Sequence, residues 1–401
     1  MLGNALTGLK VIDFTQIAAG PTCTMMLAGL GANVIKIEAP SGELGRALTP
    51  HVNDESVSFM ALNRNKRSVA LDLKNKAHLR IARQLTATAD VVVESFRPGV
   101  MDRLSLGYQQ IQEDNPRVVY CSISAYGQEG PWKDKPGVDG VVQAVSGLMS
   151  VTGVAGSAPC KVQVPIVDVV TGYLASVAVL AALAQRDREG VGQHLDVNMF
   201  ASAIALQQAA FSVYMADGVV PDRLGSAAPY AAPNEALRCA DGWIMVAAYH
   251  PARWEALCEV LGIPDKAADP RFADLPRRIA NRPELIQLLE EQMVKRSKNE
   301  WIGAFQAADI ICGPINDYSE VVNSSQFAHF RMAEKIMHPA AGEMVMPRFP
   351  LSAVGELPST RRPAPLVGEH TKDILSELGY DAEDTELLST SQRKTERALE
   401  K

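Results

Sequence analysis

Short apolar runs alternate with helical segments over the first third of the chain, and this rhythm limits the possible folds more than any other feature. Parallel strands that are covered by helices on both faces are apolar along their whole length. The chain has five such runs, at residues 9–14, 32–38, 68–73, 90–94 and 118–123, with helical segments at 21–30 and 77–87. We therefore predict an α/β fold with a parallel sheet, whose ligands bind beyond the carboxyl ends of the strands.

Changes in composition along the rest of the chain predict the domain organisation. Residues 138–214 are mostly helical and rich in small side chains, and residues 1–217 are expected to form the first part of a large domain. A linker with several prolines and glycines follows, and residues 218–328 have the strand and helix pattern of a small α/β domain. Residues 329–401 contain many prolines and one helical segment at 371–378, yet they are apolar enough to pack back on the large domain.

Composition excludes several classes of protein. The formal net charge of -7 over 401 residues argues against nucleic acid as a general partner. No apolar run reaches the length of a membrane span, so no membrane partner is expected, and no basic segment of a signal peptide precedes the first strand. The six cysteines are scattered without a CxxC pair, and no histidine stands at metal-ligand spacing, so we expect no metal site. Free thiols and the missing signal peptide predict a cytoplasmic protein.

One carboxylate, Asp168, stands where chemistry is expected. Pro165 stops any preceding helix, and a long stretch rich in Ala, Val and Leu follows, so Asp168 should lie in the first turn of a buried helix. The free N–H groups and the dipole at a helix start are expected to keep this carboxylate ionised. From the local sequence alone, Asp168 is either a helix cap or a nucleophile, and caps are the more common of the two.

Basic residues gather where a phosphate could bind. The run Asn63–Ser68 holds three cations, Lys74 follows the next strand, and further cations stand on other predicted loops. In an acidic protein such a cluster is either a solvated surface or a site for the phosphates of a nucleotide-like cofactor. Neither GxGxxG after a strand nor GxxxxGK[ST] occurs, but the turn at residues 18–21 presents a helix start that could face a phosphate or thioester.

Blocks of sequence that resemble one known family occur along nearly the whole chain. They are Leu6–Phe14 with Ala19-Gly20-Pro21, Leu30–Glu38, Asn63–Lys74, Asp90–Gly99 with Arg103, Asn115–Arg117 with Ser124–Pro131, Gly190–Val197 and the tail Gly368–Gly379. In this order and at this spacing, the chain resembles the class III coenzyme A transferases, whose best-known member is formyl-CoA transferase. The resemblance implies a Rossmann-like large domain built from both chain ends, a small domain between them, and a homodimer whose two chains interlock.

The resemblance also implies a reaction of acyl-CoA metabolism. In this family an aspartate in the sequence context of Asp168 attacks an acyl-CoA thioester, forms a mixed anhydride, and then receives CoA as an aspartyl-CoA thioester. The acceptor acid takes the CoA through a second anhydride, which requires that water stays out of the site. The substrates are an acyl-CoA and a carboxylic acid, so coenzyme A is a co-substrate and no tightly bound cofactor is expected.

The same resemblance implies a set of contacts to CoA. The implied residues are Gln16, Ala18, Leu71, Asp72, Leu73, Lys74, Ser95, Phe96, Arg97, Arg103, Lys135 and Val138. Formyl-CoA transferase has glutamine at the position of Ala18, arginine at that of Ala39, and a glycine-run loop that residues 225–230 lack here. These departures argue against formyl-CoA and oxalate as the substrate pair.

Three functions stay open at this point. The first is a CoA transferase between two carboxylic acids, with succinate or another small dicarboxylate as one of them and succinyl-CoA as a donor. The second is an α-methylacyl-CoA racemase of the same fold. Racemases of the family carry Gly-His-Asp where this chain has Gly137-Val138-Asp139, so the second acid–base group is missing and the transferase is favoured. The third, a CoA-binding protein without activity, is disfavoured by the intact context of Asp168.

Overall fold

The computed structural model describes residues 2–381, which form two compact units. The first unit holds the described residues of Met1–Leu148, Val162–Gly218 and Arg331–Lys401, and the second holds Met149–Lys161 and Val219–Phe330. The expected large domain included residues 149–161, but these group with the second unit. The reason is local pairing, because the N–H of Gly225 donates to the carbonyl of Gly153 at 2.8 Å.

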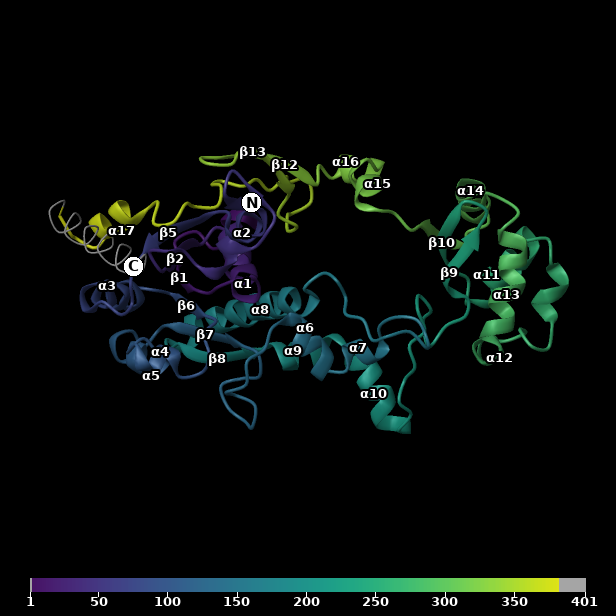
Figure 1. The fold of residues 1–401 in the computed structure, drawn as a ribbon, viewed down its shortest axis with the longest axis horizontal. Helices are drawn as coiled ribbons and strands as arrows, with labels where there is room; N and C mark the ends of the chain where they lie inside the picture. The colour runs from purple at the N-terminus through teal and green to yellow at the C-terminus, as the bar shows by residue number, and fades with distance from the viewer. Residues whose placement is uncertain (1, 382–401) are drawn as a thin grey trace. The chain divides into compact units, whose positions relative to one another are not determined.

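A six-stranded parallel sheet forms the centre of the first unit (Figure 1). Its strands, in spatial order, are β5 (Lys66–Ala70), β2 (Asn33–Glu38), β1 (Lys10–Phe14), β6 (Val91–Glu94), β7 (Val119–Ser124) and β8 (Gln193–Asn198). Every neighbouring pair runs parallel. The prediction of an α/β fold with a parallel sheet is therefore confirmed.

Helices cover both faces of this sheet, because successive side chains of a strand point to opposite faces. On β1, Val11 packs in the core of one face, whereas Ile12 and Phe14 pack in the core of the other. The helices in these two cores are α1 (Ala19–Gly29) and α8 (Ile166–Glu189) on the Val11 face, and α3 (Lys76–Ala87), α5 (Tyr108–Asp114) and α17 (Thr371–Glu377) on the other. Segments from both ends of the chain thus complete the first unit.

Helix α8 is 24 residues long, and it is the one unbent helix within residues 2–381 whose length and apolar composition would suit a membrane span. The expectation that no segment reaches that length does not hold for this helix. However, Ala175, Val179 and Leu183 of α8 are buried in the core of the first unit, together with side chains of α1 and the sheet. This packing accounts for the apolar composition of α8.

Shorter elements complete the first unit. They are β3 (His51–Val52), β4 (Glu55–Ser56), α2 (Val57–Asn63), α4 (Val100–Arg103), α6 (Asp139–Val145), α9 (Met199–Leu206), α10 (Gln208–Asp217), β12 (Ala333–His338) and β13 (Gly342–Pro347). Within the segment expected to be mostly helical, α9 and α10 meet at Gln207 and bend by 73°. The hairpin of β12 and β13 was not predicted, and its Ile336 and Met346 pack against Phe59 of α2.

The second unit has its own core around a small antiparallel sheet. Its elements are β9 (Asn234–Cys239), β10 (Gly242–Ala247), β11 (Ile311–Pro314), α11 (Pro251–Val260), α12 (Leu275–Ala280), α13 (Arg282–Met293), α14 (Lys298–Ala307), α15 (Tyr318–Val322) and α16 (Ser325–His329). Trp254, Leu289 and Phe305 are buried in that core. Arg278 is buried in the same unit, and its guanidinium donates to three backbone carbonyls, so a charged side chain helps to fix the surrounding loops.

Candidate active site

The chain reverses its direction across the sheet between β1 and β6, which creates a switch point at their carboxyl ends. From β1 the chain moves through β2 to β5 on one side, and from β6 through β7 to β8 on the other. Ligands of open α/β sheets bind at such a switch point. There the backbone N–H of Gln16, after β1, donates to Ser95 Oγ, after β6, at 3.0 Å. Two of the residues implied in CoA binding are thus brought together.

Buried charged groups hold the loop between β1 and α1. Ile17 has a φ of 68°, which is rare for a β-branched residue, and its N–H donates to Glu43 Oε2 at 3.1 Å. Lys36 Nζ donates to the carbonyl of Thr15 at 2.7 Å and lies 3.7 Å from Glu43 Oε1. Lys36 and Glu43 therefore fix the backbone that enters α1.

Helix α1 begins directly after this loop with an uncapped first turn. Ala18 is the N-cap residue, and no side-chain cap bonds to the free N–H groups of that turn. Gly172 of α8 meets the same turn, since a Cβ at this glycine would lie 2.6 Å from the carbonyl oxygen of Ala19 and from Thr22 Cβ. Because only glycine allows such a close approach, the uncapped start of α1 lies beside the first turns of α8.

Asp168 is the third residue of α8, and its side chain is half-buried. Within residues 2–381, the structure records no hydrogen bond or ion pair to its carboxylate. Pro165 is the N-cap of the helix, and Asp168 makes no capping bond. The alternative of a capping side chain is therefore wrong, and an unpaired carboxylate stands one turn before Gly172.

The surroundings of Asp168 disfavour its charged form. Burial, with a smaller contribution from the carboxylate of Asp139, raises the pKa of Asp168 to about 7. The expectation that the helix start keeps this carboxylate fully ionised is therefore wrong, because near neutral pH only about half of the molecules carry the charge. The ionised fraction is poorly solvated, which favours attack on a carbonyl carbon.

Asp139, the first residue of α6, caps α8 in place of Asp168. Its Oδ2 accepts from the N–H groups of Val167 (2.9 Å) and Asp168 (3.3 Å), and its Oδ1 accepts from Gln143 Nε2 at 2.5 Å. Asp139 thus orients the first turn of α8 and places a negative charge near the Asp168 carboxylate. Sequence reasoning missed this role, because a spacing of 28 positions between Asp139 and Val167 carries no local signal.

The segment before α6 holds two of the residues implied in CoA binding. The Val138 side chain is 62% exposed, and the Lys135 ammonium lies 4.5 Å from the centre of the Trp132 ring. A valine cannot carry a proton, so position 138 offers no acid–base partner of the kind that a racemase of this fold would need. Nothing at this position favours the racemase over the transferase.

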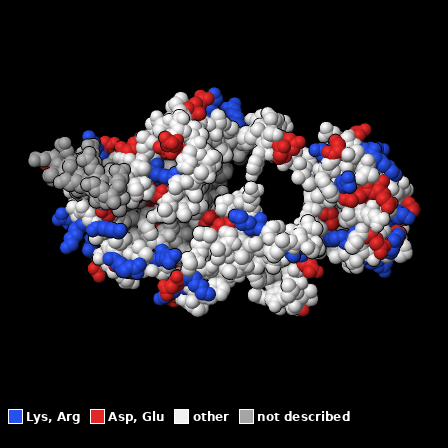
Figure 2. All heavy atoms as spheres, in the orientation of Figure 1, with Lys and Arg blue, Asp and Glu red and all other residues white. Residues whose placement is uncertain are grey.

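Further implied CoA contacts lie after β5 and β6. Leu71 is buried in the core, so only its backbone can reach a ligand, and the Asp72 carboxylate accepts the N–H of Lys74 at 3.0 Å. The side chains of Lys74, Arg97 and Arg103 are exposed, and no ion pair is recorded for them in the described part of the chain. Figure 2 shows Lys and Arg side chains over the region of α3, α4 and α5. Unpaired cations of this kind suit the binding of phosphate.

The basic run Asn63–Ser68 has a structural role. Lys66 is fully buried, and its ammonium lies 3.0 Å from Asp13 Oδ2. Arg67 donates to Glu377 through hydrogen bonds of 2.5 and 2.9 Å. Because β5 begins at Lys66, both cations lie at the amino edge of the sheet, away from the loops implied in CoA binding. Both interpretations of this run, a solvated surface and a site for cofactor phosphates, are wrong for Lys66.

Glu94 ends β6 at the switch point and was not singled out from the sequence. It is buried, and burial raises its pKa to about 7 although Ser122 and the N–H of Phe96 (2.8 Å) bond to its carboxylate. Phe96 and Leu73, both implied in CoA binding, pack partly against the neighbouring hydrophobic core. A buried carboxyl that titrates near neutral pH at this edge is typical of functional sites. The sequence signal that could have identified Glu94 was its place at the end of an apolar strand.

Comparison with known proteins identifies the family. The family model described as CoA-transferase family III matches residues 6–371. The chain is 35% identical to the succinyl-CoA:glutarate CoA-transferase of Homo sapiens, over 94% of this chain and 86% of that protein. It is 37% identical to the acetyl-CoA:oxalate CoA-transferase of Acetobacter aceti, over 92% of this chain and 95% of that protein. Among solved structures, a CAIB/BAIF family protein from Brucella suis matches with a TM-score of 0.82 and 33% identity, over 93% of this chain and 98% of that one.

These findings confirm the resemblance that the sequence blocks indicated. The family match extends over both units, and the relatives are named for the transfer of CoA to a carboxylic acid. The chain belongs to CoA-transferase family III, and it is an enzyme that moves coenzyme A between an acyl-CoA and a carboxylic acid.

Proposed function

We propose that Asp168 carries the acyl group and then the CoA during transfer. Its carboxylate attacks the carbonyl of the donor acyl-CoA, the C–S bond breaks, and CoA leaves as a thiolate from a mixed aspartyl anhydride. The thiolate attacks the aspartyl carbonyl, forms an aspartyl-CoA thioester and releases the donor acid as a carboxylate. The acceptor carboxylate repeats the first step on this thioester, and the returning thiolate attacks the acceptor carbonyl and frees Asp168.

The observation that carries this proposal is the unpaired, half-buried carboxylate of Asp168 beside the uncapped start of α1. A pKa of about 7 leaves a poorly solvated anion available at neutral pH. The free N–H groups of α1, which Gly172 allows close to α8, are donors suited to the oxyanion of each tetrahedral intermediate. Asp139 supports this arrangement, because it caps α8 and leaves the Asp168 carboxylate free.

Coenzyme A is proposed to bind across the switch point. Lys74, Arg97 and Arg103 would pair with its phosphates, since their side chains are exposed and unpaired within residues 2–381. The hydrogen-bonded pair Gln16 and Ser95 would lie along the path from these cations to α1. The thioester would then reach Asp168 past the loop that Lys36 and Glu43 hold.

The proposed donor is succinyl-CoA, and the proposed acceptor is a small dicarboxylate. The name of the human relative pairs succinyl-CoA with glutarate, which supports this choice. A dicarboxylate presents one carboxylate to the aspartyl thioester and keeps the second for recognition. Product analysis by mass spectrometry, with a panel of acyl-CoA donors and acids, tests this part of the proposal.

We further propose that two copies of the chain interlock as a homodimer. Helix α10 has no buried residue, and even its apolar Val213 and Met215 are 61% and 77% exposed. Val177 on α8 and Val141 on α6 are exposed as well, at 62% and 45%. Exposed apolar surface of this kind is typical of a protein interface, and the family resemblance implies a second copy of the chain as the partner. Light scattering should give twice the mass of one chain, and a monomer would refute the dimer.

A cytoplasmic location belongs to the same proposal. All six cysteines are free thiols, and four of them are buried. Free thiols persist in a reducing compartment, which supports the cytoplasm. Fractionation of the source cells, followed by detection of the protein, tests this location.

The role of Asp168 is tested by Asp168→Ala, with Asp222→Ala as the matched control. Asp222 is an exposed aspartate for which no partner is recorded in the described part of the chain, so its loss reports general effects only. Asp168→Ala should lose transfer from succinyl-CoA to glutarate by about a thousandfold or more, while its circular dichroism spectrum and its affinity for CoA stay as in the parent. Retained turnover would reject the nucleophile assignment.

The covalent route needs a separate test by trapping with hydroxylamine. During turnover with acyl-CoA, hydroxylamine should convert the activated aspartate to a hydroxamate and inactivate the enzyme. Mass spectrometry should then find the modification in the peptide that contains residue 168. Enzyme treated without acyl-CoA should stay unlabelled and active. Full activity after treatment during turnover would contradict a covalent intermediate even if Asp168→Ala is inactive.

A further inference from the structure

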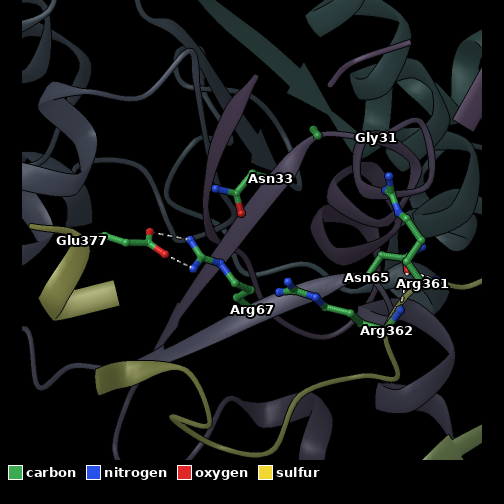
Figure 3. A pocket seen from close by; sticks show the side chains of 8 residues that line it. Gly31, Asn33, Asn65, Arg67, Arg361, Arg362 and Glu377 are labelled. Carbon is green, nitrogen blue, oxygen red and sulfur yellow. Dashed lines mark hydrogen bonds and ion pairs between the residues drawn. The ribbon is translucent and has the colours of Figure 1, made fainter. Parts of the chain in front are cut away.

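A cavity of about 390 Å³ lies at the amino edge of the central sheet (Figure 3). Its walls include the starts of β2 and β5, a stretch of the C-terminal segment and one residue of α17. The loops implied in CoA binding follow the carboxyl ends of the strands, so a strand of five residues, or roughly 16 Å, separates the two regions. The volume is in the range of small-molecule sites. Nothing in the proposed mechanism uses this cavity.

Three arginines against one glutamate make the cavity positively charged. Arg67 is 8% exposed, and its two terminal nitrogens donate to the Glu377 carboxylate, as the dashed lines in Figure 3 show. The hydrogen bond from Arg67 lowers the pKa of Glu377, which therefore stays charged. Arg67 Nε is buried and has no hydrogen-bond partner in the described part of the chain. The pair thus neutralises one arginine and leaves two.

Asn65 holds the other two arginines at the cavity. Its Oδ1 accepts from the backbone N–H groups of Arg361 (2.7 Å) and Arg362 (3.1 Å). The Arg361 guanidinium donates to backbone carbonyls of residues 3 and 28, so it is already engaged. Among the described residues, no hydrogen bond or ion pair is recorded for the exposed Arg362 guanidinium, whose charge helps to lower the pKa of Glu377 and which points toward Arg67 in Figure 3. A guanidinium without a hydrogen bond or ion pair therefore lines the same cavity as Arg67, and an anion bound there would be attracted to it.

We propose that this cavity binds a small oxyanion, either the phosphate or the carboxylate group of a metabolite, with Arg362 as its main cation. Both groups match the planar fork of a guanidinium. The amide groups of Asn33 and Asn65 line the same cavity and supply further donors. The ion pair of Arg67 and Glu377 lies on one side of the cavity. There the Glu377 carboxylate neutralises Arg67, which would otherwise be free to bind a ligand.

Calorimetric titration of the full chain tests this site, with CoA present at saturation so that its own phosphate-binding groups are occupied. Inorganic diphosphate and malonate are titrated separately at low ionic strength, and the comparison shows whether phosphate or carboxylate is preferred. We expect at least one probe to bind, and Arg362→Gln to weaken it about ten- to a hundredfold. Within the described part of the chain, this variant breaks no recorded side-chain hydrogen bond or ion pair. Arg188→Gln, which alters an exposed arginine in the last turn of α8, is the matched control and should bind as the parent does.

A second variant tests the charge argument independently. Glu377→Gln removes the internal anion, so the probe that binds the parent should bind more tightly, by about tenfold. Absence of binding by both probes overturns the proposal, and so does equal binding by the parent and Arg362→Gln. Weaker or unchanged binding in a folded Glu377→Gln variant overturns it as well. Because these residues lie outside the proposed active site, transfer activity in the variants keeps the two proposals separable.

Discussion

Replacing Asp168 by asparagine should make the protein more stable while it removes activity. The carboxylate and the amide have nearly the same shape, so the packing around α8 is kept. Burial raises the pKa of Asp168 to about 7 in the folded protein, against about 3.9 in an unfolded chain. Folding with an ionised Asp168 therefore costs up to about 4 kcal/mol at pH 8, and an asparagine carries no such cost.

The stability gain depends on pH in a defined direction. Below about pH 3 the carboxyl group is protonated in both states, so the parent and Asp168→Asn should be equally stable. Between pH 4 and pH 7 the unfolded chain loses its proton first, and the parent becomes progressively less stable than the variant. Above pH 7 the difference stays constant. The expected gain is about 4 kcal/mol at pH 8 and about 1.5 kcal/mol at pH 5.

Urea unfolding followed by circular dichroism at these two pH values measures the gain. Asp222→Asn, an exchange of the same atoms at an exposed position, is the control and should leave stability unchanged at both. Transfer activity of Asp168→Asn should fall by about a thousandfold or more, because an amide is not a nucleophile. A variant no more stable than the parent at pH 8 would refute the burial cost, and a variant that still transfers CoA would refute the chemical role.

Three further perturbations test neighbouring groups. Asp139→Asn keeps one acceptor for the start of α8 but removes a negative charge, so the pKa of Asp168 should fall and the acidic limb of kcat/KM should move to lower pH. An unmoved limb would exclude this influence. Lys66→Met removes one of the two ammonium groups that act on the buried Asp13 carboxylate, and it should lower the free energy of unfolding by about 3–5 kcal/mol in urea titrations. A loss below about 1 kcal/mol would contradict the ion pair's role. Lys74→Gln should raise the KM for acyl-CoA about tenfold with kcat nearly unchanged, and an unaltered KM at low salt would remove Lys74 from the phosphate site.

Much of the fold could be predicted wherever burial acts on a continuous apolar run. The strands β1, β2, β6 and β7 lie within one residue of their predicted bounds. The strand β5 was predicted at 68–73, but it begins at Lys66, since Lys66 and Arg67 read locally as solvated charges. Their partners, Asp13 and Glu377, lie 53 and 310 positions away in the sequence, and no local pattern reveals such pairs. The hairpin of β12 and β13 was missed for a similar reason, because it packs against α2, which lies in the first third of the chain.

The candidate site could be predicted only in part. Pro165 and the apolar run after it placed Asp168 in the first turn of a buried helix, and the structure confirms this position. The protonation of Asp168 was predicted wrongly, because the helix start alone favours the charged form whereas burial and Asp139 oppose it. Gly172 permits the contact between α1 and α8, but the sequence around it carries no signal of that contact. These properties depend on packing between elements and not on local sequence.

Two aspartates of the same unit show how one type of side chain serves structure or chemistry. Asp13 is fully buried, and burial alone raises its pKa, but Lys36, Lys66 and hydrogen bonds from Thr15 outweigh that effect and lower the pKa to about 2. Asp168 is less buried, yet no cation or hydrogen-bond donor within residues 2–381 is recorded for its carboxylate, so its pKa rises to about 7. A carboxylate engaged by ammonium and hydroxyl groups cannot attack a carbonyl carbon, whereas an unpaired one in a poorly solvated place can. With both buried lysines acting on Asp13, the anion of Asp168 stays destabilised, as its proposed nucleophilic role requires.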